Sequence, residues 1–323
     1  MYRIDDATAA TALPAPEAAG TEGFFTEGNP ASGTPATNVR GSWLNMIQEE
    51  LRAIAVAGGQ TPTKGVNNQV LAAITRMSSG VVGASRNLVM NVSAASASAT
   101  VTADELIVEA ALGGLRYCLG SFNQTINLST TGAGGVDTGA APVSGFVGIY
   151  AIFNPSTGAR STVARNATSA AVSEVYGGAN MPAGFTASAL IAVVPTNASG
   201  QFSPVSVKDR HVDTAGIAVM SATAYQAAYT SFSVAAAVPL NAKRAHVTGF
   251  LGNTTANSSS SVTFSGSSVE QGVLYVSGSF VPNTGNTLAN NGSLPILTPQ
   301  TLYWKGGGTG TPSISMNVTG YDF

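Results

Sequence analysis

Charged side chains are scarce in this chain of 323 residues, where they make up 9% of the total, against roughly 25% in an average soluble domain. Hydrophobic residues reach 44%, so the low charge does not indicate disorder, which combines few hydrophobic residues with high charge. The surface must therefore consist largely of Ser, Thr, Asn, Gly and Ala. The net charge of −2 argues against a broad electrostatic attraction to nucleic acid.

Cysteine, histidine and long apolar runs are also nearly absent. Cys118 is the sole cysteine, which excludes an intrachain disulfide and a thiolate metal cage; its strand-like setting, LRYCL, predicts a buried side chain. His211 and His246 are isolated in the sequence, and we expect no metal site and no cofactor. Apolar runs such as 189–194 are far shorter than the roughly 18 residues that span a bilayer, so no membrane insertion is expected. The first twenty residues lack a basic segment followed by an apolar one, so we expect no export signal.

The first 80 residues differ in pattern from the rest. Residues 1–40 are rich in Pro, Ala, Thr and Gly and predict an extended arm. The segment 41–59, GSWLNMIQEELRAIAVAGG, predicts a helix capped by Ser42 and ended by Gly58 and Gly59. A second helical pattern covers 67–80, with an apolar face and a stop at Gly80. Two short helices form only a thin core, so we expect them to pack on each other and on a neighbouring chain.

After about residue 85 the pattern changes to alternating strands separated by Gly, Pro and Asn clusters. Residues 86–213 predict seven or eight strands, with ADEL (103–106) open to interpretation as a turn and weak helical potential at 172–176. Residues 207–216, VKDRHVDTAG, look like a linker or domain seam. Further strands follow it, and residues 214–323 carry only five formal charges, Lys243, Arg244, Glu270, Lys305 and Asp322. The predicted fold is mainly β: an arm and two helices (1–80), a β-rich domain (81–213) and a C-terminal β-sandwich (214–323).

Several segments of the chain, taken in order, resemble one family of proteins. MYRIDDATAA, FTEGNPASGTPAT and GSWLNMIQEELRAIAVAGG resemble the virion-binding N-terminus of bacteriophage tail fibre proteins. GGLRYCLGSFNQTINL, GFVGIYAIFNPSTG and VYGGANMPAGFTASALIAVV resemble a β-rich module of tail fibres from phages of Gram-negative bacteria. The resemblance covers about residues 1–213 and does not extend to 214–323.

This resemblance implies an intertwined homotrimeric fibre, made in the host cytoplasm and assembled into the virion. Its N-terminus would dock to baseplate proteins, and its C-terminus would bind a host receptor such as lipopolysaccharide, another glycan or a pilus. The chain has no collagen-like repeat, long heptad array or His-X-His repeat. These absences favour a short fibre over a long needle.

Candidate docking residues are the large apolar side chains of the arm and first helix. An aromatic pair in a polar arm usually packs on another surface, and the first helix has an apolar face beside its tryptophan. These side chains either pack only within their own arm and helix or dock to the baseplate and trimer partners. They are Phe24, Phe25, Trp43, Leu44, Ile47, Leu51 and Ile54.

The candidate receptor-binding residues are Tyr303, Trp304, Lys305 and Tyr321. Aromatic faces stack on sugar rings, and a lysine beside them can meet a phosphate or carboxylate of lipopolysaccharide. Trp304 is equally open to interpretation as a core residue, with the glycines after it forming a turn. The GGGTG that follows lacks the ending of a phosphate loop.

An enzyme is the alternative from another class, because some tailspikes are depolymerases that cut capsule or lipopolysaccharide with paired carboxylates. The best carboxylate cluster is Asp104, Glu105 and Glu109, and Asp209 and Asp213 flank His211. No Gly-X-Ser-X-Gly motif accompanies that histidine. We therefore expect no enzymatic activity, and the third alternative is an architectural baseplate component that never touches a receptor.

Overall fold

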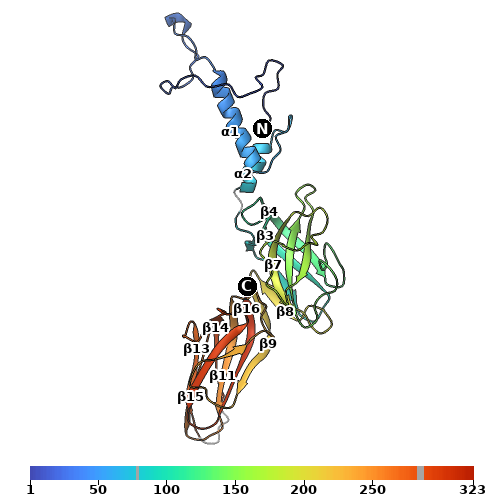
Figure 1. The fold of residues 1–323 in the computed structure, drawn as a ribbon, viewed down its shortest axis with the longest axis vertical. Coiled ribbons are helices and arrows are strands. Elements are labelled where there is room, and N and C mark those ends of the chain that lie inside the picture. The colour runs from blue at the N-terminus through green and yellow to red at the C-terminus, as the bar shows by residue number, and fades with distance from the viewer. Residues whose placement is uncertain (78–79, 282–286) are drawn as a thin grey trace. The chain divides into compact units, whose positions relative to one another are not determined.

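The computed structural model describes residues 1–77, 80–281 and 287–323. It is mainly β, with two α-helices and antiparallel sheets, as predicted (Figure 1). The chain forms two compact units, Met1–Ser79 and Gly80–Phe323. In the part of the chain that is described, no helix has the length and apolar character needed to cross a bilayer.

The first unit consists of the arm, a short 3-10 helix η1 (Pro30–Ser32), and the helices α1 (Gly41–Ala57) and α2 (Gln69–Met77). Helix α1 begins after Arg40 without a side-chain cap, so the predicted cap at Ser42 is wrong by two positions. It ends at Gly58, as predicted. This glycine permits close contact between the helices, because an added Cβ would lie 2.2 Å from the Cβ of Ala73 in α2.

Residues 85–208 of the second unit form eight strands. The most buried are β5 and β7, whose side chains are almost all shielded from solvent, as expected for strands covered on both faces. ADEL lies within the continuous strand β3, so the alternative interpretation as a turn is wrong, and residues 172–176 form no helix. The eight are β1 (Ser85–Arg86), β2 (Val89–Val92), β3 (Ser98–Glu109), β4 (Arg116–Asn127), β5 (Phe146–Phe153), β6 (Arg160–Asn166), β7 (Ala187–Pro195) and β8 (Val205–Lys208).

The segment predicted to be a linker is a β-hairpin. Strand β8 pairs with β9 (His211–Ala222) from Val205↔Thr214 to Lys208↔His211. The turn between them holds Asp209 at a φ of 53°. The expected boundary between 213 and 214 therefore falls inside strand β9. This strand is hydrogen-bonded to β8 on one side and to β16 on the other.

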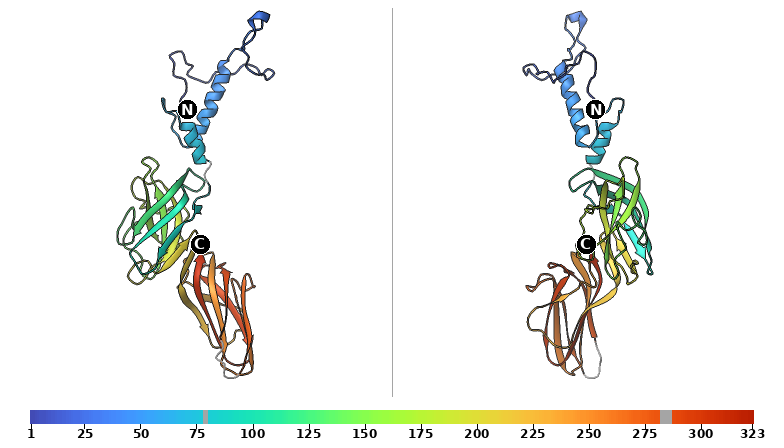
Figure 2. Two further views of the ribbon diagram at one scale, coloured as in Figure 1. Left: turned by 180° about the vertical axis from the view of Figure 1, so that it is seen from behind. Right: turned by 45° about the vertical axis from the view of Figure 1, so that its right-hand side comes forward.

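The remaining strands form a sandwich. One layer has the order β14-β11-β16-β9 and the other β10-β15-β12-β13. Figure 2 shows these strands, coloured yellow to red, gathered in one body. Their bounds are β10 (Thr230–Ser233), β11 (Arg244–Asn253), β12 (Ser258–Ser265), β13 (Val273–Phe280), β14 (Thr287–Pro295), β15 (Thr301–Gly308) and β16 (Pro312–Asp322).

The interior of this sandwich is tightly packed. A Cβ added at Gly249 in β11 would lie 2.7 Å from the ring of Phe264 in β12, so the two layers approach closely at that point. Phe264 and Leu302 are fully buried, and Trp304 is 5% exposed. Burial of such side chains is the main favourable contribution to the stability of the sandwich.

Polar contacts join the C-terminal strands to the strands before β9. The hydroxyl of Tyr321 donates to the carbonyl of Val193 at 2.6 Å. The guanidinium of Arg210 makes two hydrogen bonds of 2.8 Å to the carboxylate of Glu174 and a third to the carbonyl of Phe323 at 2.9 Å. Bidentate arginine–carboxylate pairs are among the stronger polar contacts in proteins.

Candidate functional site

The predicted docking residues of the arm and helix α1 form a partly exposed apolar surface. Phe24 is 98% exposed. The ring of Phe25 packs edge-on against that of Trp43, with centroids 4.8 Å apart. Leu44 is exposed, whereas Ile47, Leu51 and Ile54 are half-buried.

Part of this surface is a groove between the arm and α1. It is lined by Leu13, Pro14, Pro16, Trp43 and Met46, together with polar groups of the helix. Ion pairs connect the arm to the rest of the first unit: Arg3 bonds to Glu49 at 2.6 Å, and Lys64 bonds to Asp5 at 2.6 Å. The groove remains open to solvent within the first unit.

The predicted receptor-binding residues are separated by the alternation of strand β15. Trp304 points between the two layers, where it lies level with the buried Phe264 and Leu274 of the neighbouring strands. Tyr321 is fully buried and is hydrogen-bonded inside the protein. The burial of both side chains gives no support to their interpretation as contact residues. Their burial fits the core alternative for Trp304.

Tyr303 and Lys305 lie on the outer face of the sheet β10-β15-β12-β13. Lys305 is level with Thr263 of β12 and, beyond it, with Tyr275 of β13. Residues directly opposite one another in a ladder project to the same face. Tyr275 is 54% exposed, and the prediction from sequence missed it. The alternation in VLYVS would have placed it opposite the buried Leu274 and Val276.

Lys305 is already engaged by neighbouring side chains. Its ammonium forms an ion pair with the carboxylate of Glu270 and lies 4.7 Å from the ring centroid of Tyr229. The hydrogen bond to Glu270 raises the pKa of Lys305, and the same contact lowers the pKa of Glu270. Both groups remain charged at neutral pH, and the lysine is thus partly neutralised for any ligand.

A shallow depression on the outer face adjoins Tyr275. Its lining consists of serines and glycines from β12, β13 and β15. Serine hydroxyls both donate and accept hydrogen bonds, so a tyrosine ring next to them can bind a sugar by stacking and by hydrogen bonding. We name these residues the serine depression: Ser259, Ser260, Ser261, Tyr275, Ser277, Gly278, Ser279, Gly307 and Gly308.

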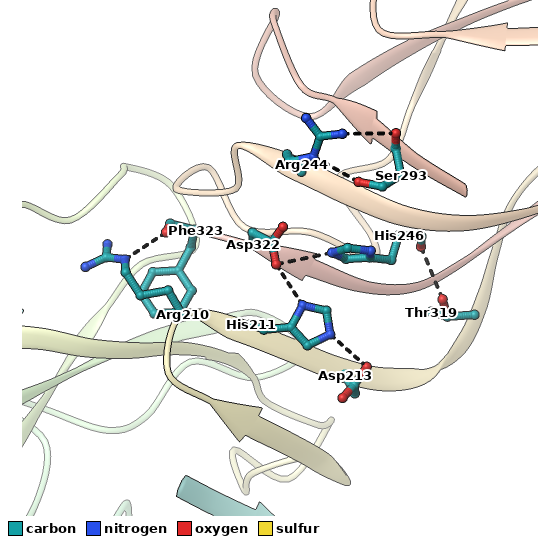
Figure 3. A network of polar contacts seen from close by, with 9 residues as sticks. All are labelled: Arg210, His211, Asp213, Arg244, His246, Ser293, Thr319, Asp322 and Phe323. Atoms are coloured by element: carbon teal, nitrogen blue, oxygen red, sulfur yellow. Dashed lines mark hydrogen bonds and ion pairs between the residues drawn. The ribbon is translucent and has the colours of Figure 1, made fainter. Parts of the chain in front are cut away.

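A different cluster forms where the C-terminal strand lies between β9 and β11 (Figure 3). His211 Nδ1 lies 2.7 Å from Asp322 Oδ1, and His211 Nε2 lies 3.0 Å from Asp213 Oδ1. His246 Nε2 lies 3.2 Å from the same oxygen of Asp322. The two imidazole rings meet edge-on with centroids 4.6 Å apart. The two histidines expected to be isolated thus share one carboxylate.

The charges of this cluster stabilise one another. Burial by itself lowers the pKa of His211, but the hydrogen bonds to Asp322 and Asp213 outweigh it and raise this pKa above the ordinary value. Burial by itself raises the pKa of Asp322, but the contacts with His211 and His246 outweigh it and lower this pKa. Donor atoms of His211, His246 and Asp322 lie within 4.8 Å of one another, a spacing at which one metal ion can contact all three.

The carboxylates considered for catalysis are occupied by other contacts. Asp104 accepts a hydrogen bond from Asn87 at 2.6 Å, and Glu105 accepts one from Cys118 at 3.1 Å. Glu109 is 2% exposed and pairs with Arg116 at 2.8 Å. Cys118 itself is exposed on β4, and the prediction of a buried cysteine is wrong because Leu119 takes the inward position.

Comparison with known proteins finds a partial match. No protein-family model matches the chain. A stretch of 74 residues, 23% of the chain, is 42% identical to the uncharacterized protein StfP of Escherichia coli (strain K12). The match covers 34% of StfP, so the chain spans about a third of the length of this relative.

Proposed function

We propose that this protein is a bacteriophage tail fibre that holds the virion through residues 1–80 and binds the host surface through residues 214–323. The proposal rests on the resemblance of residues 1–213 to tail fibres. The partial match to StfP, whose name suggests a side tail fibre, agrees with it. The fold is compatible with this role, because a small helical unit precedes an extensive β-structure of low charge.

The observation that carries the docking half is the exposed apolar surface of the first unit. Phe24, Trp43 and Leu44 each expose 40% or more of their area, which is a substantial apolar area for a unit with so small a core. Contiguous exposed apolar surface marks interaction sites in soluble proteins. We assign this surface to baseplate proteins and to the other two chains of a homotrimer.

The receptor half of the proposal now rests on the serine depression and the outward residues Tyr303 and Lys305. These groups offer aromatic faces, hydroxyls and one cation, a combination suited to a glycan such as lipopolysaccharide. Three such surfaces on one fibre, repeated over several fibres, would act by avidity, so that each contact can be weak.

Adsorption and assembly assays test the two halves separately. Deleting residues 1–79 should leave a folded protein that competes with phage for host cells but no longer joins particles. Tyr275→Ala should reduce competition while leaving assembly intact, and Val269→Ala, which alters another exposed residue of the same region, is the matched control. Normal incorporation of the deletion variant would reject docking through residues 1–79. Undiminished competition by Tyr275→Ala would reject the serine depression as the contact.

The same purified protein separates the remaining alternatives. Release of reducing sugar from host polysaccharide would establish a depolymerase. A protein that enters virions but neither inhibits adsorption nor releases sugar would be an architectural component. Mass measurement in solution tests the trimer directly.

A further inference from the structure

We propose that His211, His246 and Asp322 bind one divalent transition-metal ion, with Zn²⁺ as the ion best matched to their donors. Two imidazole nitrogens and one carboxylate oxygen are a donor set found in protein zinc sites. The three residues come from adjacent strands, with β16 between β9 and β11, so the site links strands far apart in the sequence. Metal binding by these residues does not depend on the proposed role in a phage tail.

The spacing of the donor atoms fits a single ion. With bonds of about 2.0–2.1 Å, neighbouring ligand atoms of a tetrahedral zinc ion lie about 3.3 Å apart. Asp322 Oδ1 is 2.7 Å from His211 Nδ1 and 3.2 Å from His246 Nε2, and the three donor atoms lie within 4.8 Å of one another. Figure 3 shows both imidazole rings directed toward the carboxylate of Asp322, so the three donor groups face a common point.

His246 supplies an independent indication. Its Nε2 atom is buried and forms no well-aligned hydrogen bond with any described residue, and its contact with Asp322 Oδ1 at 3.2 Å is an ion pair. Buried polar atoms in proteins are almost always hydrogen-bonded. A metal ion between His246 and Asp322 would satisfy this nitrogen.

Asp213 completes the arrangement from outside. It lies 3.0 Å from His211 Nε2, the ring nitrogen that faces away from Asp322. Metal-binding histidines usually donate their other N–H to a carboxylate, which fixes the ring and the tautomer. Asp213 therefore acts as a positioning residue that directs Nδ1 of His211 toward the ion.

The backbone around Gly320 favours the close approach of His211, His246 and Asp322. Gly320 of β16 lies opposite His246 on one side and Asp213 on the other. An added Cβ there would lie 2.5 Å from the carbonyl oxygen of Val212, so a side chain at this position would disturb the strand that carries His211. The side chains of His211, His246 and Asp322 are each about one-third exposed, which leaves access for the ion and for a water as a further ligand.

Zinc binding by the full chain, produced without a histidine tag and treated with a chelator, tests the proposal. Calorimetric titration with Zn²⁺ should give one ion per chain, and the temperature of unfolding should rise with added Zn²⁺ because the ion binds the folded state. Co²⁺ should give the visible absorption of a low-coordinate site. Mg²⁺ should not bind, because it prefers oxygen ligands.

Variants assign the binding to these residues. His246→Ala and Asp322→Asn should each abolish the titration signal while the chain stays folded, and Asp213→Asn should weaken binding about 10- to 100-fold. Asp104 is an exposed aspartate outside the cluster, so Asp104→Asn is the control and should bind Zn²⁺ as the parent does. If His246→Ala or Asp322→Asn impairs folding, the Zn²⁺ affinity of Asp213→Asn decides whether this cluster binds the ion. Absence of Zn²⁺ binding by the folded parent, or equal binding by these variants and the parent, would overturn the proposal.

Discussion

His211 and His246, the two histidines of the chain, meet with ring centroids 4.6 Å apart on either side of Asp322. Nothing in their sequence spacing indicates this. The contact arises from ladder order, because β16 pairs with β9 through Asp322↔His211 and with β11 through Gly320↔His246. A long-range pairing has thus produced a polar cluster at the C-terminal end of the chain.

Replacement of Trp304 by alanine should destabilise the protein. Trp304 is 5% exposed and packs between the layers of the sandwich, and loss of a buried tryptophan costs about 3–5 kcal/mol. Urea unfolding of the second unit should show this decrease in the free energy of unfolding. Tyr275→Ala, on the outer face, is the control and should change it by less than about 1 kcal/mol. A Trp304→Ala protein that is as stable as the parent but fails to adsorb would instead indicate that Trp304 contacts the receptor.

Stability should fall steeply at alkaline pH. Tyr150 is fully buried and donates to the carbonyl of Ser173 at 2.7 Å, and burial raises its pKa to about 12. An unfolded tyrosine ionises near pH 10. Between these values the unfolded state has lost a proton that the folded state keeps, so the free energy of unfolding decreases by about 1.4 kcal/mol per pH unit for this residue.

The variant Tyr150→Phe tests whether Tyr150 causes this loss of stability at alkaline pH. The variant should lose about 1 kcal/mol at neutral pH with its hydrogen bond, yet its stability should fall less steeply above pH 10. Urea unfolding from pH 8 to about pH 11 measures both effects, with Tyr275→Phe as an exposed control. Equal slopes for parent and Tyr150→Phe would contradict the role of Tyr150.

The Cys118 thiol should react slowly despite its exposure. Desolvation and the hydrogen bond to Glu105 raise the pKa of Cys118 to about 11, so about one thiol in a thousand is ionised at pH 8. Glu105→Gln removes the negative charge beside the sulfur and should accelerate alkylation by iodoacetamide several-fold. Asp104→Asn, on the neighbouring residue, should not. The reaction is simple to follow because Cys118 is the sole cysteine, and an unchanged rate in Glu105→Gln would refute the effect of that carboxylate.

Gly58→Ala should loosen the helical unit. The added methyl group would lie 2.2 Å from the Cβ of Ala73, so α1 and α2 must separate, at a cost of about 1–3 kcal/mol. Hydrogen exchange of peptides from both helices, measured by mass spectrometry on the full chain, should become faster. At Gly41 an added Cβ meets nothing within 4 Å, so Gly41→Ala should leave exchange unaltered. Identical protection in Gly58→Ala would show that the helices do not need this close approach.

Local sequence patterns predicted most elements of the fold. Alternation identified β3, β4, β5 and β7, and the glycine after α1 identified the end of that helix. Strand β14 carries no clear strand signal, because its sequence, TLANNGSLP, contains the Asn and Gly that usually mark turns. The start of strand β9, residues 211–216, was interpreted as part of a linker because charged residues are concentrated in 207–216. The ladders of β9 with β8 and β16 override that local signal.

The candidate sites were less predictable than the fold. Alternation in TLYWK shows that Tyr303 and Trp304 face opposite sides, but only the position of the second layer decides which side is buried. Tyr275 becomes relevant only because β13, β12 and β15 lie side by side. For the same reason the shared carboxylate of the two histidines could not be seen without the order of the strands.

Strand β9 also has a mechanical consequence. It is hydrogen-bonded to β8 near its start and to β16 along most of its length, so the backbone passes from one group of strands to the next without a free linker. A force applied along this strand would be resisted by two ladders of backbone hydrogen bonds acting together. If the protein serves in a tail fibre as proposed, a force transmitted along the fibre would load these main-chain hydrogen bonds in shear, where many must break at once.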